Sequence, residues 1–548
     1  MPDASSSSTA PRSRREPGAG ERLARNAAAN FAGQAILLGL SFFATPYLVH
    51  HFGARRYGVL ALSLGLVSLL SLFELGFNSG LVKFLAASLA RERRADAESY
   101  LRTGVALYLA LGASVAVAAA WGARWAVHAF FHLPGELSGE AAAGIELGCV
   151  AFLARFSAGA FSAVPIAAER FGVVNAVFVS TEAARISASV LAVALHPRPS
   201  ALVSSVLLVN VATNVLFFIA SLWAARRILP GVRLWPSVSR RHLADLILFS
   251  KFAAPSQIAS RAGNGLDSAL LAHLLPVEFV AFYVVPSALC FKIWTLVGNV
   301  TSVVFPAASA LDASAGPARV RELYLRANKF VLALAALPAL ALLLLGRQVL
   351  ALWIGPEFAR QGSTALALLS AGVLVNCLMH VPDALANGLG RPSLSAGFNI
   401  AETTLKFGLF FLLVPRMGVA GASAAYLAAQ VLLVPWYVRA AGRMTGTGWR
   451  ELFSRAYRPA IIPAAAASLV LAAWRTRIGS FTDLVFALAS AGAVYALFGV
   501  YFILDSRERL VCFMLARRAG LARRGGLPAR GAISLESVTS ETTSGAEP

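Results

Sequence analysis

The chain has 548 residues, of which 57% are hydrophobic and only 14% are charged, and its mean hydropathy is +0.68. A soluble protein of this length needs more polar surface to cover its core, so the composition excludes a soluble globular fold and indicates an all-α integral membrane protein. The net charge of +21 could indicate nucleic-acid binding, and only the positions of the charges decide this. The four cysteines lack CxxC spacing and predict neither a disulfide framework nor a zinc site.

Apolar stretches of about 20 residues, each long enough to cross ~30 Å of hydrocarbon, recur along most of the chain. A basic tail rich in Ser, Pro and Gly, residues 1–25, precedes them and is predicted to be disordered. The sequence predicts about 14 transmembrane helices in all. They lie near 28–50, 58–83, 99–121, 141–166, 173–195 and 201–224, then near 246–274, 279–306, 328–347, 363–388, 393–414 and 417–440, and finally near 459–474 and 481–504. A basic and partly disordered tail, 505–548, follows them.

The basic residues alternate in abundance between successive loops. With the N-terminus inside, the inner loops hold roughly twice as many Arg and Lys residues as the outer loops, and both tails add to the inner side. This asymmetry predicts that both termini are cytoplasmic. The positive charge is therefore explained by topology and by contact with anionic membrane lipids, and no nucleic-acid partner is predicted.

Three pairs of segments resemble one another at an offset of about 220 residues, which indicates an internal repeat. One pair is "PRPSALVSSVLLV" from Pro197 and "PRMGVAGASAAYL" from Pro415. The offset corresponds to six predicted helices, an even number, so the two copies have the same orientation in the membrane. We therefore expect two parallel six-helix lobes related by an axis along the membrane normal. The predicted N-lobe is 26–224, the linker 225–245, the C-lobe 246–440 and the additional helix pair 441–504.

Eleven charged residues lie well inside predicted helices. A charge at the centre of a membrane helix costs roughly 2.5–3.5 kcal/mol, so most of them must face the interior of the bundle. The cations are Arg155, Arg185, Arg261, Lys292 and Lys406, and the acids are Glu74, Glu146, Glu182, Asp267, Asp383 and Glu402. Polar residues with similar placement are predicted to line a shared cavity, namely Asn30, Gln34, Asn78, Gln257, Asn264, Asn299, Asn376, His380 and Asn387. No metal or cofactor site is predicted, because no nucleotide-binding loop or metal-ligand spacing is present.

Each embedded charge has a structural and a functional interpretation. The pairs Glu182–Arg185 and Glu402–Lys406 could neutralise each other within one helix, or serve in gating. Three cations, Arg155, Arg261 and Lys292, have no acid within one helical turn. Such cations favour an anion, and a phosphate or pyrophosphate matches them best. The acids Asp267, Asp383, Glu182, Glu402 and Glu74, with His380, are candidates for ion coupling or gating. Trp294, two residues from Lys292, is a candidate for stacking on a sugar ring.

Several segments resemble the polysaccharide-export flippases of the multidrug/oligosaccharidyl-lipid/polysaccharide exporter superfamily, which include O-antigen and capsule translocases. The resemblance is carried by residues 25–86 and 240–285, by "VLALWIGPEF" (349–358), by "ANGLGRPSLS" (386–395) and by "RMGVAGASAAYLAA" (416–429). It covers most of the chain from about residue 25 to 440.

The resemblance implies two six-helix lobes that flip undecaprenyl-pyrophosphate-linked oligosaccharides across the bacterial plasma membrane by alternating access. A cationic cavity would hold the pyrophosphate, with Arg155, Arg261, Lys292, Arg185 and Lys406 as candidates, and a polysaccharide polymerase or ligase would be a partner. The last two helices resemble those of fourteen-helix members, which include lipid II flippases. A lipid II flippase and a drug antiporter therefore remain alternatives. A membrane glycosyltransferase is disfavoured, because the longest predicted outer loop, 122–140, holds only two acids.

Overall fold

The computed structural model describes residues 19–131, 133, 135–195, 199–301, 304, 308, 311, 316–506 and 508–510. The two predicted tails lie mostly outside these residues. The described part of the chain is helical and contains no strand, and twelve of its helices are long and apolar enough to cross a membrane. The prediction of an all-α membrane protein is therefore confirmed.

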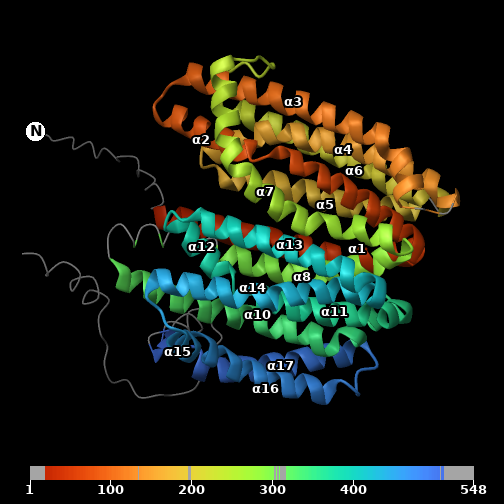
Figure 1. Cartoon of the computed structure of the whole chain (residues 1–548), viewed down its shortest axis with the longest axis vertical. Coiled ribbons are helices and arrows are strands. Elements are labelled where there is room, and N and C mark those ends of the chain that lie inside the picture. The colour runs from red at the N-terminus through yellow and green to blue at the C-terminus, as the bar shows by residue number, and fades with distance from the viewer. Residues whose placement is uncertain are drawn as a thin grey trace, which may run out of the picture.

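The helices follow one another in the predicted order (Figure 1). The first half of the molecule, as the term is used below, consists of α1 (Ala19–Leu70), η1 (Ser71–Glu74), α2 (Phe77–Ala90), α3 (Arg94–Trp125), η2 (Ala126–Phe130), α4 (Gly135–Ala167), α5 (Phe171–Leu195) and α6 (Pro199–Ile228). The second half consists of α7 (Arg240–Leu274), α8 (Glu278–Thr301), α10 (Pro317–Trp353), α11 (Pro356–Cys377), α12 (His380–Gly388), α13 (Pro392–Met417) and α14 (Val419–Thr445). Then come α15 (Trp449–Leu452), η3 (Phe453–Tyr457), α16 (Arg458–Trp474) and α17 (Phe481–Phe502).

Helix α1 contains the first predicted crossing and the beginning of the second. It has 52 residues, and Gly53 interrupts it with φ 65° and ψ 168°, a conformation that glycine adopts without the strain a Cβ would add. Helix α7 is absent from the twelve apolar helices, because polar and charged residues are spread along it. These two features account for the difference between twelve apolar helices and the roughly 14 crossings expected from the sequence.

The two halves repeat the same helix packing. Helix α3 packs on α4 as α10 packs on α11, and α4 packs on α6 as α11 packs on α14. Helix α5 packs on α6 as α13 packs on α14, and α1 packs on α5 as α7 packs on α13. The repeated pairs are what two similar six-helix units require, and they support the internal repeat inferred from the sequence.

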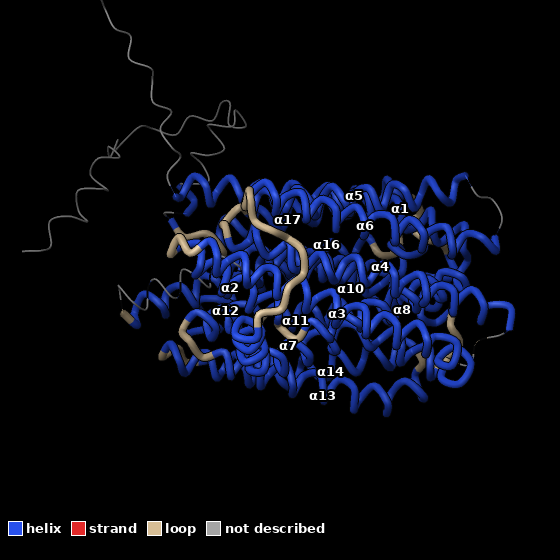
Figure 2. The backbone as a smooth tube through the Cα atoms, turned by 90° about the horizontal axis from the view of Figure 1, so that it is seen from above, coloured by secondary structure: helices blue, strands red, loops and turns tan. Residues whose placement is uncertain are grey.

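Most of the long helices run roughly along one direction, and the first part of α7 crosses it (Figure 2). Helix α1 begins and α17 ends at the same end of the bundle, which we call the termini end (Figure 1). Helix α7 starts there against the first half, where Tyr100 donates a hydrogen bond of 2.7 Å to Asp245. It ends against α8 and α13, so α7 bridges the two halves diagonally.

At the opposite end, called the far end below, the two halves meet through close contacts. A Cβ on Gly58 of α1 would lie 2.2 Å from the carbonyl oxygen of Val277, just before α8. The indole nitrogen of Trp353 donates a 2.8 Å hydrogen bond to the carbonyl of Phe42, and the two rings stack. These contacts close the two halves against each other at the far end.

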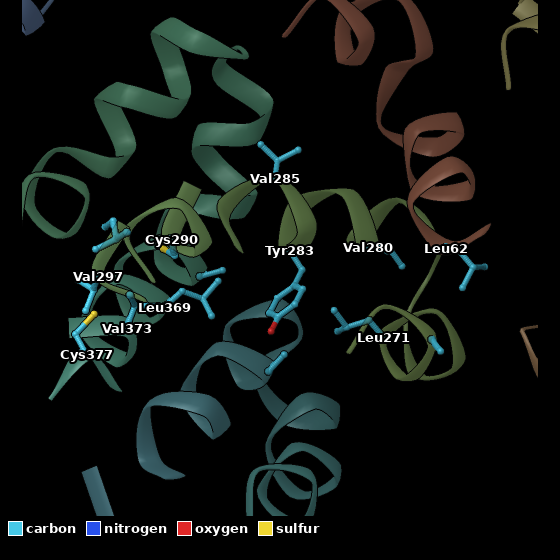
Figure 3. Close-up of a cluster of buried hydrophobic side chains, with 14 of the residues drawn as sticks. Leu62, Leu271, Val280, Tyr283, Val285, Cys290, Val297, Leu369, Val373 and Cys377 are labelled. Atoms are coloured by element: carbon cyan, nitrogen blue, oxygen red, sulfur yellow. The ribbon is translucent and has the colours of Figure 1, made fainter. Parts of the chain in front are cut away.

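Helix α8 is the apolar centre of the second half. Val280 lies near Leu62 and Leu271, whereas Cys290 and Val297 lie beside residues of α11, among them Val373 (Figure 3). Tyr283 points away from this layer, on the opposite side of α8 from Val285 (Figure 3). Its hydroxyl is therefore available to the polar residues described below.

The last helices, α15 to α17, are held to α10 by ion pairs at the termini end. Lys329 of α10 is only 5% exposed and lies 3.2 Å from Glu508 and 3.6 Å from Asp505. Arg455 pairs with Glu322 at 2.8 Å, and Arg321 pairs with Glu451. Among the described residues, these ion pairs anchor the additional helix pair to the second half.

The contact at Gly58 predicts that Gly58→Ala lowers the stability of the protein, because the new methyl group would overlap the backbone of Val277. The matched control is Gly122→Ala in α3, where a Cβ would meet no atom within 4 Å. There, alanine should be neutral or stabilising, by up to about 1 kcal/mol. The measurement is the thermal unfolding midpoint of both variants in detergent. Equal midpoints would show that the far-end contact adjusts without cost.

Candidate functional site

A cavity of about 500 Å³ lies within the second half, between α7, α8, α11, α13 and α14. Ser68 of α1 contributes to the wall, so the first half closes one side of it. The wall carries three of the predicted charged residues, Asp267, Glu402 and Lys406, among aromatic, hydroxyl and amide side chains. The structure thus brings together side chains that are far apart in the sequence.

The strongest interaction in the cavity wall is an ion pair between α13 and α7. The Lys406 ammonium lies 2.8 Å from one Asp267 oxygen, and Tyr283 of α8 donates a 2.8 Å hydrogen bond to the other oxygen. Lys406 is 5% exposed and Asp267 is 15% exposed. The lysine therefore connects two helices, and its charge also acts on Glu402 one turn away in its own helix.

Glu402 instead belongs to a chain of amides. Gln430 of α14 donates a hydrogen bond to Glu402, and Asn376 of α11 donates one of 2.9 Å to Gln430. Gln430 was missed by the sequence analysis. The only signal for it is a single amide in an apolar helix, and a single amide does not say which helix it faces.

A second charged group lies in the first half, on α4 and α5. Arg185 pairs with Glu182 at 2.8 Å within α5, as one interpretation of the sequence predicted. Arg155 of α4 approaches the same carboxylate at 3.9 Å, and its guanidinium lies 3.7 Å from the centre of the Phe217 ring. The sequence shows no acid within one helical turn of Arg155, and the acid that it approaches comes from another helix. Both arginine side chains remain about one third exposed.

Lys292 of α8, in the second half, lies within electrostatic range of this group. The charges of Arg185 and Glu182 both act on its ammonium group, and its side chain is exposed. Arg155, Arg185 and Lys292, with the single acid Glu182, are called the cationic group below. Arg155, Glu182 and Arg185 lie ten or more residues from both ends of their helices. Lys292 lies nine residues before the last residue of α8, Thr301. The group therefore lies near the middle of the bundle's height and has an excess of positive charge.

Other predicted site residues have structural contacts. Tyr108 donates a 3.3 Å hydrogen bond to Glu74, and Asn78 donates one of 3.0 Å to the carbonyl of Gly159. In the second half, Tyr437 and Asn387 both donate to Asp383, at 3.2 and 3.3 Å. These contacts connect neighbouring helices within each half or stabilise one helix.

His380 is partly buried beside Trp294, with ring centres 5.2 Å apart. Its Nε2 atom has no hydrogen-bond partner among the described residues. Gln34, Gln257 and Asn299 are partly buried. The side chains of Asn30, Arg261 and Asn264 lie outside the described residues, so the predicted role of Arg261 stays a prediction. Within the described part, no cluster of three or more His, Cys, Asp or Glu side chains has the arrangement of a metal site.

The ion pair in the cavity wall predicts a non-additive response to mutation. Asp267→Asn or Lys406→Met alone should destabilise the protein by about 3–5 kcal/mol, because each leaves one buried charge without its partner. The double variant should recover much of this loss, since neither member of the Asp267–Lys406 pair is left charged without the other. The measurement is thermal unfolding of the three variants in detergent. Additive losses would contradict a direct pair.

The family model described as "Polysaccharide biosynthesis protein" matches residues 53–359. A Shigella flexneri protein assigned as an O-antigen transporter is 21% identical over 425 residues, covering 75% of this chain and 96% of that protein. The uncharacterized membrane protein EpsK of Bacillus subtilis (strain 168) is 22% identical over 363 residues, covering 65% and 70%.

Solved structures show the same fold at low identity. An inward-facing multidrug resistance transporter of the MATE family, in the MOP superfamily, aligns with TM-score 0.64 and 14% identity, covering 77% of this chain and 99% of that one. The lipid II flippase MurJ, in an inward closed conformation, aligns with TM-score 0.65 and 10% identity, covering 87% and 98%. The resemblance inferred from the sequence is confirmed by these matches. Since the family model spans more than half of its residues, the chain belongs to the polysaccharide biosynthesis protein family, and it has the fold of these MOP-superfamily structures.

Proposed function

We propose that this protein translocates undecaprenyl-pyrophosphate-linked oligosaccharides across the bacterial plasma membrane, with both termini cytoplasmic. Membership of a polysaccharide biosynthesis family of transporters supports the substrate class. The observation that carries the proposal is the cationic group, because three cations with one acid are held near the middle of the bundle. Such a charge excess is costly in a membrane unless an anion approaches it.

A pyrophosphate fits the cationic group chemically. Two guanidinium groups can each bind phosphate oxygens with two hydrogen bonds, and the ammonium of Lys292 adds a third charge from the opposite half. The Phe217 ring against Arg155 holds that guanidinium in place. The substrate would therefore be held by both halves at once.

The closed far end supports an inward-facing state. Contacts at Gly58 and Trp353 hold the halves together there, so a lipid-linked sugar would enter from the termini end. Translocation then requires these contacts to separate and new contacts to form at the termini end. Helix α7 contacts both halves and is the element that must change its packing in this step.

A drug antiporter of the same superfamily is less consistent with these side chains. Its cationic substrates would favour acids where the two halves face each other, whereas the cationic group has one acid and three cations, and the excess of acids lies in the cavity wall of the second half, where Asp267 is already paired with Lys406. A lipid II flippase shares the pyrophosphate and remains chemically compatible with the same group. Comparing different lipid-linked saccharides separates these two flippase functions.

The proposal predicts that Lys292→Gln and Arg155→Gln slow translocation without unfolding the protein. A charge-assisted hydrogen bond contributes about 1.5–3 kcal/mol, so each loss should lower the rate at sub-saturating substrate by roughly 10- to 100-fold. The measurement uses proteoliposomes and a fluorescent undecaprenyl-pyrophosphoryl trisaccharide. The control, Arg124→Gln, removes the same charge from a side chain that is 79% exposed.

Normal rates in both variants at a normal unfolding midpoint would exclude the cationic group as the pyrophosphate site. A wild-type protein that moves no anionic lipid-linked saccharide would contradict the proposed function itself.

A further inference from the structure

We propose that the cavity in the second half binds the saccharide of the substrate, and that the cationic group binds only its pyrophosphate. This inference rests on the proposed function and assigns a ligand class to a separate site. The cavity has a volume of about 500 Å³, within the range of about 300–1,000 Å³ that is usual for small-molecule sites. It can hold a few sugar residues, and the rest of a longer oligosaccharide would extend out of it.

The wall of the cavity has the side chains that sugars require. Phe291, Trp294 and Tyr426 supply aromatic surface, on which the apolar C–H face of a sugar ring can stack. Ser287, Asn399 and Thr403 supply hydroxyl and amide groups around it. Phe291 is 50% exposed although it lines the cavity, so its ring is accessible to a ligand. Aromatic faces beside many neutral donors and acceptors suit an uncharged, hydroxyl-rich ligand.

The charges of the cavity exclude the phosphate from it. Its wall carries the carboxylates of Asp267 and Glu402 and the ammonium of Lys406, and that ammonium already lies 2.8 Å from Asp267. The other carboxylate, that of Glu402, would repel a pyrophosphate. It can, however, accept a hydrogen bond from a sugar hydroxyl. Asn376 is 4% exposed, lines the same wall, and its Oδ1 has no hydrogen-bond partner among the described residues.

Helix α8 places the two sites side by side. Ala288, Phe291 and Trp294 line the cavity and lie on one face of the helix. At 100° per residue, Lys292 lies roughly 40° around the helix from Ala288, at the edge of that face. Lys292 itself lies about 100° around the helix from Phe291 and about 160° from Trp294, so a pyrophosphate held by it would lie at the Ala288 edge of the cavity, and the sugars would extend past this edge to reach the aromatic rings. This order, with phosphate next to sugar, is that of the substrate.

The main competing use of the cavity is a site for a coupling cation at Asp267 and Glu402. Lys406 already supplies a cation to Asp267, and the aromatic part of the wall contributes nothing to coordination of a small ion by oxygen. These observations favour the saccharide. The experiment below distinguishes the two ligands.

The test measures binding of three lipids by the full-length protein in nanodiscs: undecaprenyl pyrophosphate, the same lipid with one N-acetylhexosamine, and the same lipid with a trisaccharide. The wild type should bind the saccharide-bearing lipids more tightly than the bare lipid. Trp294→Ala should weaken binding of the saccharide lipids by about tenfold, the loss of one aromatic stacking contact, and leave the bare lipid unchanged. Trp294→Phe should restore most of the preference, and Trp121→Ala, whose side chain is 89% exposed, should have no effect.

The inference is overturned if the wild type binds all three lipids with equal affinity. This comparison uses only the wild-type protein, so it does not depend on whether a variant folds. It is also overturned if Trp294→Ala and Asn399→Ala leave the preference intact and instead change the dependence of transport on Na⁺ or H⁺. Translocation of all three lipids with equal affinity would refute the saccharide site and keep the proposed function. Preferential binding of the saccharide lipids without any translocation would refute the proposed function and keep the saccharide site.

Discussion

The cost of placing a charge inside a membrane determines how this molecule is organised. No water in the hydrocarbon core can solvate an ammonium or a carboxylate, so each one must find a partner in the protein or a ligand. In a chain with 57% hydrophobic residues, the few embedded charges therefore identify where helices meet and where a polar substrate can pass. The helix packing, the cavity and the cationic group all follow from this constraint.

The two halves meet the constraint in different ways at equivalent positions. Arg185 and Lys406 each stand fourteen residues after the first residue of their helices, Phe171 and Pro392. Arg185 uses an acid in its own helix and stays partly exposed towards the other half, whereas Lys406 reaches Asp267 on another helix and is almost fully buried. The same helix packing thus carries an excess of positive charge in the first half and an aromatic cavity with two acids and one cation in the second half. That division matches a substrate with a charged pyrophosphate and a hydroxyl-rich saccharide.

The sequence predicted the fold well because a membrane helix is a run of about 20 consecutive, mostly apolar residues, which can be recognised in the sequence directly. Length and hydropathy placed the helices, and the offset of about 220 residues predicted a repeat that the packing of α4 on α6 and of α11 on α14 reproduces.

Contacts between helices were predicted poorly, because helical spacing shows which side chains share a face but not what that face meets. The sequence offered an acid near Lys406 in the same helix, and the structure supplies one from α7. It showed no acid near Arg155, and Glu182 comes from α5. Gln430, a lone amide in α14, could be assigned a role only from its contacts with Glu402 and Asn376.

The central claim is that the wild-type protein moves a lipid-linked saccharide by recognising its pyrophosphate. The most direct measurement compares initial translocation rates in proteoliposomes for one saccharide linked to undecaprenyl through a pyrophosphate, through a monophosphate and through an uncharged linker. If the cationic group binds the diphosphate, the pyrophosphate-linked substrate should move fastest and the uncharged one should move no faster than in protein-free liposomes. Equal rates for all three substrates would contradict the account, because the linker would then make no contact that matters for translocation.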